Sequence, residues 1–280
     1  MILSITHGMH SLREGRERFT ASEAAMFLAD AGFEGLDVNF FGTTNSGYKR
    51  EKILDGAWRQ NVDELKKVIC QRNLKVESIH TPAEYFFLKD PSLRPEYEGK
   101  MYRSLEAASM LGAKYAVIHP VTNPDHTKTL VDESISQLRP FQEYARKLNV
   151  TLAVENLPCT SPEEQIDIAD TLGCVCCWDT GHANMRSEDQ ADAIRKVGNR
   201  IRVTHVHDNN GKDDEHYPPY FGTICWERVM KAFKDIDYQG FLNFEVLIKV
   251  LPEAMHATYA AYTLECGKHL RTLFENAERA

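Results

Sequence analysis

The sequence predicts an α/β protein that forms one closed (β/α)8 barrel, a TIM barrel, as a single domain over residues 1–280. Eight short runs rich in β-branched and aromatic residues recur along the chain, and segments with helical spacing of apolar residues separate them. No Gly/Ser linker or charge block divides the chain. Alternating strands and helices are typical of parallel βα units, and about 250 residues suffice for one barrel. A doubly wound open sheet is the alternative that this pattern leaves open.

The predicted strands are short runs with the composition of a pleated, buried chain. In chain order they are ILSIT (2–6), GLDVNF (35–40), VESIH (76–80), YAVIH (115–119), TLAVEN (151–156), CVCCWD (174–179), IRVTHVH (201–207) and FLNFEV (241–246). The cysteines of the sixth run are interpreted as small buried hydrophobes rather than metal ligands. Because the chain has seven cysteines, an odd number at irregular positions, we expect reduced thiols.

The predicted helices lie between these strands. Examples are EAAMFLADAG (23–32), NVDELKKVICQRN (61–73), YRSLEAASMLGA (102–113) and SQLRPFQEYARKL (136–148). Two further helix starts are predicted from capping boxes. Ser161 precedes Pro162 and is followed by Glu164, and Ser187 opens a second box that ends at Gln190.

Composition narrows the class of protein. With 42% hydrophobic residues the chain can build a sizeable core, and no run approaches the ~18 apolar residues of a membrane span. The first ten residues, MILSITHGMH, lack the basic and apolar regions of a secretory signal, so a cytoplasmic location is expected. A net charge of −8 argues against nucleic acid as the partner.

Ionisable residues end six of the predicted strands, and in a closed barrel those ends converge on one face. These residues are His80, His119, Glu155, Asp179, His205 and Glu245. A carboxylate that enters an apolar core costs several kcal/mol unless it is paired or bound to metal. Three converging carboxylates would repel one another, and a divalent cation would relieve that repulsion. The sequence therefore predicts a metal site at Glu155, Asp179, His205 and Glu245, with ligands that suit Mn, Mg, Co or Zn.

Other polar residues near these strand ends allow more than one interpretation. His80 or His119 taken alone is typical of a hydrogen-bonded core histidine. His182 follows Asp179 by three residues, and Asp214 and His216 form a D-x-H pair in a later loop. These residues could bind a second metal ion, bind substrate, or be solvated. His207 and Asp208 are predicted to lie near or beyond the barrel rim, with at most an indirect role.

The motifs VIHP, VENLP, WDTGHA, HVHDNNGKDDEH and FEV resemble those of the xylose-isomerase-like barrel superfamily. That superfamily comprises sugar and sugar-phosphate isomerases and epimerases together with type IV apurinic endonucleases. The resemblance implies a metal held by Glu155, Asp179, His205 and Glu245, with the two glutamates as acid and base in epimerase-like members. In endonuclease-like members it implies three zinc ions, held also by the residues that match His80, His119, His182, Asp214 and His216.

The chain also departs from these patterns. Gly211 stands where ketose 3-epimerases have an arginine that contacts substrate, and Tyr220 and Cys225 stand where many relatives have Gly and Asp. The segment DTGH, residues 179–182, replaces the DTCH of the endonucleases. The polar tail after His205 resembles the sugar isomerase and epimerase branch more closely.

The function expected from the sequence is a metal-dependent isomerase or epimerase that acts on a sugar, sugar phosphate or related polyol. One glutamate would remove a proton to give an enediolate and the other would return it, while His182 holds a substrate oxygen. The alternatives are a zinc-dependent abasic-site endonuclease and a sugar-binding protein without catalysis. A basic groove would favour DNA, and a closed pocket walled by Trp178, Tyr220, Phe221 and Trp226 would favour a sugar. Association into a homo-oligomer is left open.

Overall fold

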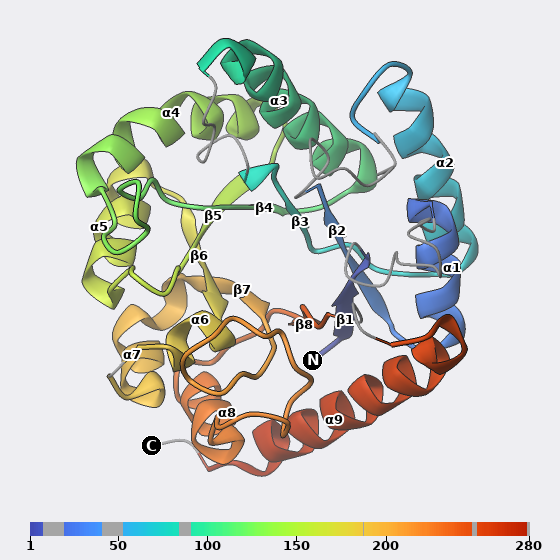
Figure 1. Cartoon of the computed structure of the whole chain (residues 1–280), viewed down its shortest axis with the longest axis vertical. Helices are drawn as coiled ribbons and strands as arrows, with labels where there is room; N and C mark the ends of the chain where they lie inside the picture. Colours follow the sequence, from blue (N-terminus) through green and yellow to red (C-terminus); the bar gives the residue numbers. More distant parts are fainter. Residues whose placement is uncertain (8–19, 41–52, 84–90, 187, 248–250, 279–280) are drawn as a thin grey trace.

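The computed structural model describes residues 1–7, 20–40, 53–83, 91–186, 188–247 and 251–278. Figure 1 shows a ring of parallel strands surrounded by helices, the single (β/α)8 barrel that the sequence predicts. The strands are β1 Leu3–Thr6, β2 Gly35–Asn39, β3 Ser78–His80, β4 Tyr115–Ile118, β5 Thr151–Glu155, β6 Val175–Asp179, β7 Ile201–His205 and β8 Leu242–Phe244. All eight predicted strands are confirmed, and most are shorter than the sequence runs.

The strands follow one another in chain order around the barrel, with β8 beside β1. The ring closes between β7 and β8, just beyond the last residue of β7. Val206 N donates to Asn243 O at 2.7 Å, and Glu245 N donates to Val206 O at 3.1 Å. These two bonds fix the height of His205 relative to Glu245, so the candidate site depends on where the barrel closes.

The α-helices of the described chain form the outer layer. They are α1 Ala21–Asp30, α2 Trp58–Gln71, α3 Arg94–Leu111, α4 Val131–Lys147, α5 Pro162–Leu172, α6 Thr180–Asn184, α7 Gln190–Val197, α8 Trp226–Asp235 and α9 His256–Asn276. Among the described residues, the short 3-10 turns η4 Pro91–Leu93, η5 Gly198–Arg200 and η6 Glu253–Met255 adjoin α3, β7 and α9. In the described ranges, no helix combines the length and the apolar character that crossing a membrane requires.

One predicted helix start is confirmed and the other is wrong. Ser161 caps α5: its side chain accepts from Glu164 N, and the Glu164 carboxylate accepts from Ser161 N at 2.8 Å. The second box fails because α7 begins at Gln190 and its N-cap is Asp189, which accepts from the N–H of Asp192 at 3.1 Å. A carboxylate one residue before the helix is an effective cap, so it supersedes a serine two residues earlier. Ser187 itself lies outside the described residues.

The barrel interior has an apolar half and a polar half. Val117, Ala153, Cys177 and Val203, on β4 to β7, form a small buried cluster inside the ring. On the opposite side, Asp37 Oδ1 accepts a 2.7 Å hydrogen bond from Ser78 Oγ, and Asn243 Nδ2 donates to Thr6 Oγ1 at 3.0 Å. The candidate site lies above this floor, at the carboxyl ends of the strands. Cys176 and Cys177 are buried as predicted, and all seven cysteines are free thiols.

Candidate metal centre

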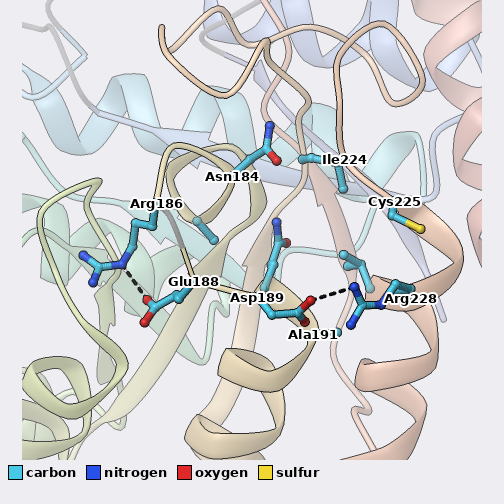
Figure 2. Close-up of a pocket in the computed structure, with 11 residues that line it drawn as sticks. Asn184, Arg186, Glu188, Asp189, Ala191, Ile224, Cys225 and Arg228 are labelled. Carbon is cyan, nitrogen blue, oxygen red and sulfur yellow. Dashed lines mark hydrogen bonds and ion pairs between the residues drawn. The ribbon is translucent and has the colours of Figure 1, made fainter.

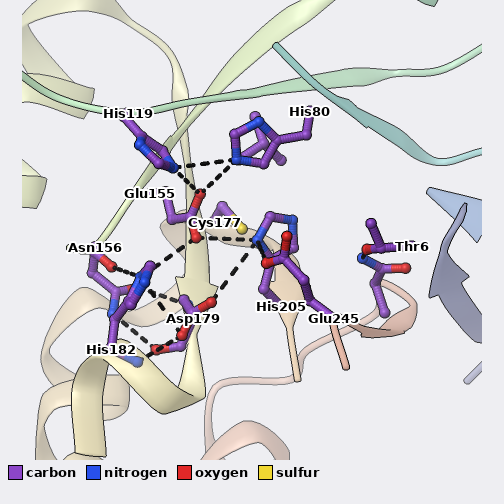
Figure 3. A network of polar contacts seen from close by, with 12 residues as sticks. Thr6, His80, His119, Glu155, Asn156, Cys177, Asp179, His182, His205 and Glu245 are labelled. Carbon is purple, nitrogen blue, oxygen red and sulfur yellow. Dashed lines mark hydrogen bonds and ion pairs between the residues drawn. The ribbon is translucent and has the colours of Figure 1, made fainter. Parts of the chain in front are cut away.

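Four ionisable residues meet at the carboxyl ends of β5 to β8. Glu155, Asp179 and His205 are the last residues of their strands, and Glu245 directly follows β8. Their exposed fractions are 1%, 0%, 0% and 5%. One ligand atom from each lies within 4.8 Å of the others, so the structure brings together the four residues that the sequence predicts as metal ligands (Figure 3). We refer to these four residues as the donor set.

One nitrogen of His205 faces the three carboxylates of the donor set. His205 Nδ1 lies 2.9 Å from Glu245 Oε2, 3.1 Å from Glu155 Oε1 and 4.0 Å from Asp179 Oδ2. In the described part of the chain, the ion-pair partners of these carboxylates are histidines only. Neither Lys nor Arg from that part of the chain supplies their counter-charge.

The electrostatics show that the donor set requires positive charge. Burial alone would raise the pKa of Glu155, but His205 and His119 outweigh burial and hold that pKa well below its usual range. Burial and His205 oppose each other in the same way at Glu245, and the result is a pKa of about 2. For His205, burial disfavours the charged form, yet the neighbouring acidic groups raise its pKa well above the ordinary value. Buried carboxylates with pKa values this low stay charged, and the facing imidazoles are the groups that keep them so.

The chemistry of this donor set fits a divalent ion. Oε2 of Glu155 is buried and accepts no well-formed hydrogen bond within the described ranges, although imidazole nitrogens lie near it. Carboxylate oxygens with one imidazole nitrogen suit the harder divalent metals and zinc. Several divalent ions accept such ligands, so the four residues of the donor set do not by themselves select one metal.

His80 and His119 lie on the other side of Glu155. His80 Nε2 and His119 Nε2 are 3.3 Å and 3.2 Å from Glu155 Oε2, and 3.2 Å from each other. The Nδ1 atom of His80 lies 2.7 Å from the carbonyl oxygen of Thr81, which orients the ring. Both histidines are buried, as expected of hydrogen-bonded core residues, and both rings also point at one carboxylate oxygen.

A third group lies where the β7–α8 loop, residues 206–225, crosses the barrel mouth. Asp214 Oδ2 lies 3.0 Å from His216 Nε2 and 3.4 Å from His182 Nε2. The second ring nitrogen of each histidine contacts a backbone carbonyl, Asn156 O for His182 and Glu245 O for His216. The two imidazoles hold the pKa of Asp214 far below its usual range despite partial burial, and the pKa of His216 rises to about 9. This loop therefore places Asp214 beside His182 at the barrel mouth.

Asp208 fixes the β7–α8 loop. Its Oδ1 accepts from Asn209 N and Ile224 N at 2.9 Å and 3.2 Å, and its Oδ2 accepts from Tyr220 N and Trp226 Nε1, both at 3.0 Å. Gly222 allows this close packing, since a Cβ there would lie 2.1 Å from Asn209 O. One buried carboxylate thus ties both ends of the loop that carries Asp214 and His216.

One expectation about the surroundings was wrong. His207 and Asp208 do not lie beyond the rim, because both are fully buried and His207 Nε2 is 3.0 Å from Asp179. The aromatic-walled pocket that would favour a sugar does not form from the described residues. Trp178 and Trp226 are buried in the layer between sheet and helices. The Phe221 side chain is 59% exposed, and its ring contacts that of Tyr262. Side chains alternate in direction along β6. Because Cys177 and Asp179 face into the barrel, Trp178 between them faces outward toward the helices.

A cavity of about 170 Å³ lies between the starts of α7 and α8, away from the donor set (Figure 2). Two arginines line it, but each is paired with an acid at 2.6 Å: Arg186 with Glu188 and Arg228 with Asp189. The arginine charges are therefore compensated, and this cavity does not provide the basic groove that would favour DNA.

The chain is a parallel barrel whose strand ends carry clustered His, Asp and Glu donors. It therefore falls in the class of barrel proteins with a candidate metal centre at the carboxyl ends of their strands. Within that class, the chain belongs to the xylose isomerase-like TIM barrel family, whose model matches residues 26–262.

The relatives in this family include sugar epimerases. D-psicose 3-epimerase of Enterocloster bolteae is 31% identical over 124 residues, 41% of this chain and 40% of that protein. Fructoselysine 3-epimerase of Shigella flexneri is 24% identical over 69% of this chain and 72% of that protein. An uncharacterised Sinorhizobium fredii protein is 28% identical over 50% of each chain. The chain thus spans about half the length of several curated relatives that it matches.

Solved structures share the fold. A D-tagatose 3-epimerase-like protein superimposes with a TM-score of 0.76 at 20% identity, over 98% of both chains. D-psicose 3-epimerase from Clostridium cellulolyticum, solved with D-tagatose, gives 0.72 at 17% identity over 96% of this chain and 99% of that one. At these identities the likeness establishes the barrel architecture.

Proposed function

We propose that this chain is a metal-dependent isomerase or epimerase of a sugar, sugar phosphate or related polyol. The observation that carries the proposal is the convergence of Glu155 and Glu245 on His205 Nδ1, with Asp179 beside them. The sugar epimerases among the relatives support it, since two facing carboxylates can remove and return a proton next to a carbonyl.

The residues divide the chemistry between them. A divalent ion held by the donor set would polarise a substrate carbonyl and the adjacent hydroxyl. Glu155 or Glu245 removes the proton from the carbon beside the carbonyl, which gives an enediolate, and itself becomes a carboxylic acid. The other glutamate, which takes up a proton from solvent before this step, gives that proton to the enediolate. Return on the opposite face inverts that carbon, whereas return to the neighbouring carbon moves the carbonyl. His182, across from Asp214, can hold a substrate oxygen.

The test is solvent isotope exchange. The purified protein, loaded with Mn²⁺, Co²⁺, Mg²⁺ or Zn²⁺, is incubated in ²H₂O with a panel of ketoses, aldoses and their phosphates. We expect deuterium at the carbon next to the carbonyl during turnover. Glu155→Gln and Glu245→Gln should each abolish the exchange, because an amide cannot accept the proton. Exposed Glu143→Gln on α4 is the matched control.

Metal content must be measured in each variant, because both glutamates are also proposed ligands. Exchange that persists in either metal-loaded variant contradicts the proposed acid–base pair. A wild-type protein that binds these sugars with metal and turns none of them over would instead support a sugar-binding role.

A second candidate function is hydrolysis of a phosphodiester at an abasic DNA site by several zinc ions. The specific observation in its favour is that nine donors form three neighbouring groups, with Glu155 between His80, His119 and the donor set. The net charge of −8 weighs against it. Three zinc ions per chain with cleavage of abasic DNA, and no isotope exchange with sugars, would select this function.

A further inference from the structure

His207 is a buried imidazole inside the site that the proposed chemistry does not use. Its side chain is 0% exposed, and its Nε2 lies 3.0 Å from Asp179 Oδ1 and from Asp179 Oδ2. Its ring stacks on that of His216, with centroids 4.0 Å apart and planes inclined by 17°. The His207 ring therefore lies between Asp179 of the donor set and His216, which belongs to the same β7–α8 loop.

Gly181 creates the space that the His207 ring occupies. A Cβ at Gly181 would lie 1.9 Å from His207 Cε1 and 2.3 Å from His207 Nδ1, far inside van der Waals contact. The backbones are held together as well, because His207 N donates to Thr180 Oγ1 at 3.0 Å and Thr180 Oγ1 donates to His207 O at 2.7 Å. Any larger residue at position 181 would displace the ring. The glycine of the DTGH segment and His207 thus form a structural pair.

The geometry distinguishes between two roles for this ring. His207, Asp214 and His216 are close enough to be considered as ligands of a further ion. However, imidazole lone pairs lie in the ring plane, and two nearly parallel stacked rings direct those lone pairs side by side rather than toward one point. A single ion would therefore fit both rings poorly. Donation from His207 Nε2 to Asp179 needs no such rearrangement.

We propose that His207 is a positioning residue that donates to Asp179 and orients this carboxylate toward the metal, and that Gly181 is required to admit it. Asp179 Oδ1 also accepts from His182 N at 2.7 Å, so the two donors together fix the carboxylate. Partners that orient metal ligands typically contribute 10- to 100-fold to metal affinity. This inference rests on the proposed function, because it requires Asp179 to bind an ion.

The test measures Mn²⁺ affinity by calorimetry and the visible spectrum of bound Co²⁺, using metal-stripped protein. His207→Leu keeps the bulk but removes the donor, and we expect about 10- to 100-fold weaker binding with an altered Co²⁺ spectrum. His207→Gln keeps an N–H donor and should restore much of the affinity. The melting temperature of each metal-free variant is measured alongside. A general loss of structure would lower that temperature, whereas the loss of a positioning residue would weaken metal binding without lowering it.

The pairing with Gly181 is tested by a double-mutant cycle. Gly181→Ala alone should destabilise the protein and weaken Mn²⁺ binding. In the His207→Ala background the same substitution should have little further effect, because the clashing ring is gone. If the losses of Mn²⁺ affinity in the two single variants add up in the double variant, the pairing of Gly181 with His207 is overturned. If His207→Leu binds Mn²⁺ as tightly as wild type, the positioning role of His207 is overturned, while the proposed function still stands. A wild-type protein that binds none of these ions would overturn both this inference and the proposed function.

Discussion

Buried Glu155 and half-buried Glu77 illustrate how surroundings decide the charge of the same side chain. Glu155 is held charged by facing imidazoles, and its pKa lies well below the usual range. Glu77, which precedes β3 at the other end of the barrel, has no such cluster. Burial raises its pKa to about 7, against the opposing effects of the Phe241 N–H and Lys114. Glu77 Oε2 accepts from Phe241 N at 2.7 Å.

The shift at Glu77 predicts a pH-dependent stability. A carboxyl whose folded pKa is raised stabilises the fold fully below its unfolded value of 4.5, and this stabilisation is lost as pH rises through about 7. A glutamine side chain at this position would keep an acceptor for Phe241 N but could not ionise. We therefore expect Glu77→Gln to gain about 1–3 kcal/mol relative to wild type between pH 5 and pH 8. Urea unfolding at both pH values measures the difference.

Glu143→Gln is the matched control for Glu77, because Glu143 is exposed on α4. Its stability relative to wild type should change little between the two pH values. A Glu77→Gln difference that is the same at pH 5 and pH 8 would contradict the assigned shift.

At the scale of elements, the β7–α8 loop depends on Asp208 more than on regular secondary structure. Four donors converge on this carboxylate, three from the loop backbone and one from the Trp226 indole at the start of α8. The loop also carries Asp214 and His216. Its placement over the mouth thus follows from one buried hydrogen-bond centre.

Removing that centre should loosen the loop. Asp208→Ala leaves buried donors unsatisfied, each of which costs about 1–3 kcal/mol, and we expect a net destabilisation of about 2–4 kcal/mol. Trypsin should then cleave after Lys212 more rapidly. Urea unfolding and timed proteolysis measure the two effects. Asp213→Ala, at an exposed acid of the same loop, should change stability by less than about 0.5 kcal/mol, and an equal effect of both substitutions would argue against the role of Asp208.

The strands could be predicted because their composition is read from short local stretches of sequence. The four residues of the donor set could be predicted because strand ends converge in every closed parallel barrel. His207 could not be placed in the same way. It lies past the last residue of β7, where the bridge through Val206 continues the inward-facing pattern, and its space depends on Gly181 from another element. Trp178 faces outward from β6 into the core, as its alternation with the inward-facing Asp179 indicates. The loop contacts required Asp208, whose partners are up to 18 residues away in the sequence.

At the scale of the whole molecule, the donor set comes entirely from one half of the barrel. Its residues end or follow β5, β6, β7 and β8, the last of which lies beside β1. An ion bound there would connect four strands whose sequence positions span residues 155 to 245. Metal binding should therefore stabilise the fold, and the strands β5 to β8 should be stabilised more than the other strands of the barrel.

The last prediction follows from this asymmetry. Mn²⁺ at about 100 times its Kd should stabilise the metal-stripped protein by about 2.7 kcal/mol, which corresponds to a rise in Tm of about 5 °C. Amide hydrogen exchange should slow most in β5 to β8 and least in β2 and β3, because only the former end at or directly before residues of the donor set. Asp179→Asn, which removes one carboxylate while keeping its size, should lose most of both effects. A rise in Tm of the same size in Asp179→Asn, or protection spread evenly over all eight strands, would show that the ion stabilises the protein from another place.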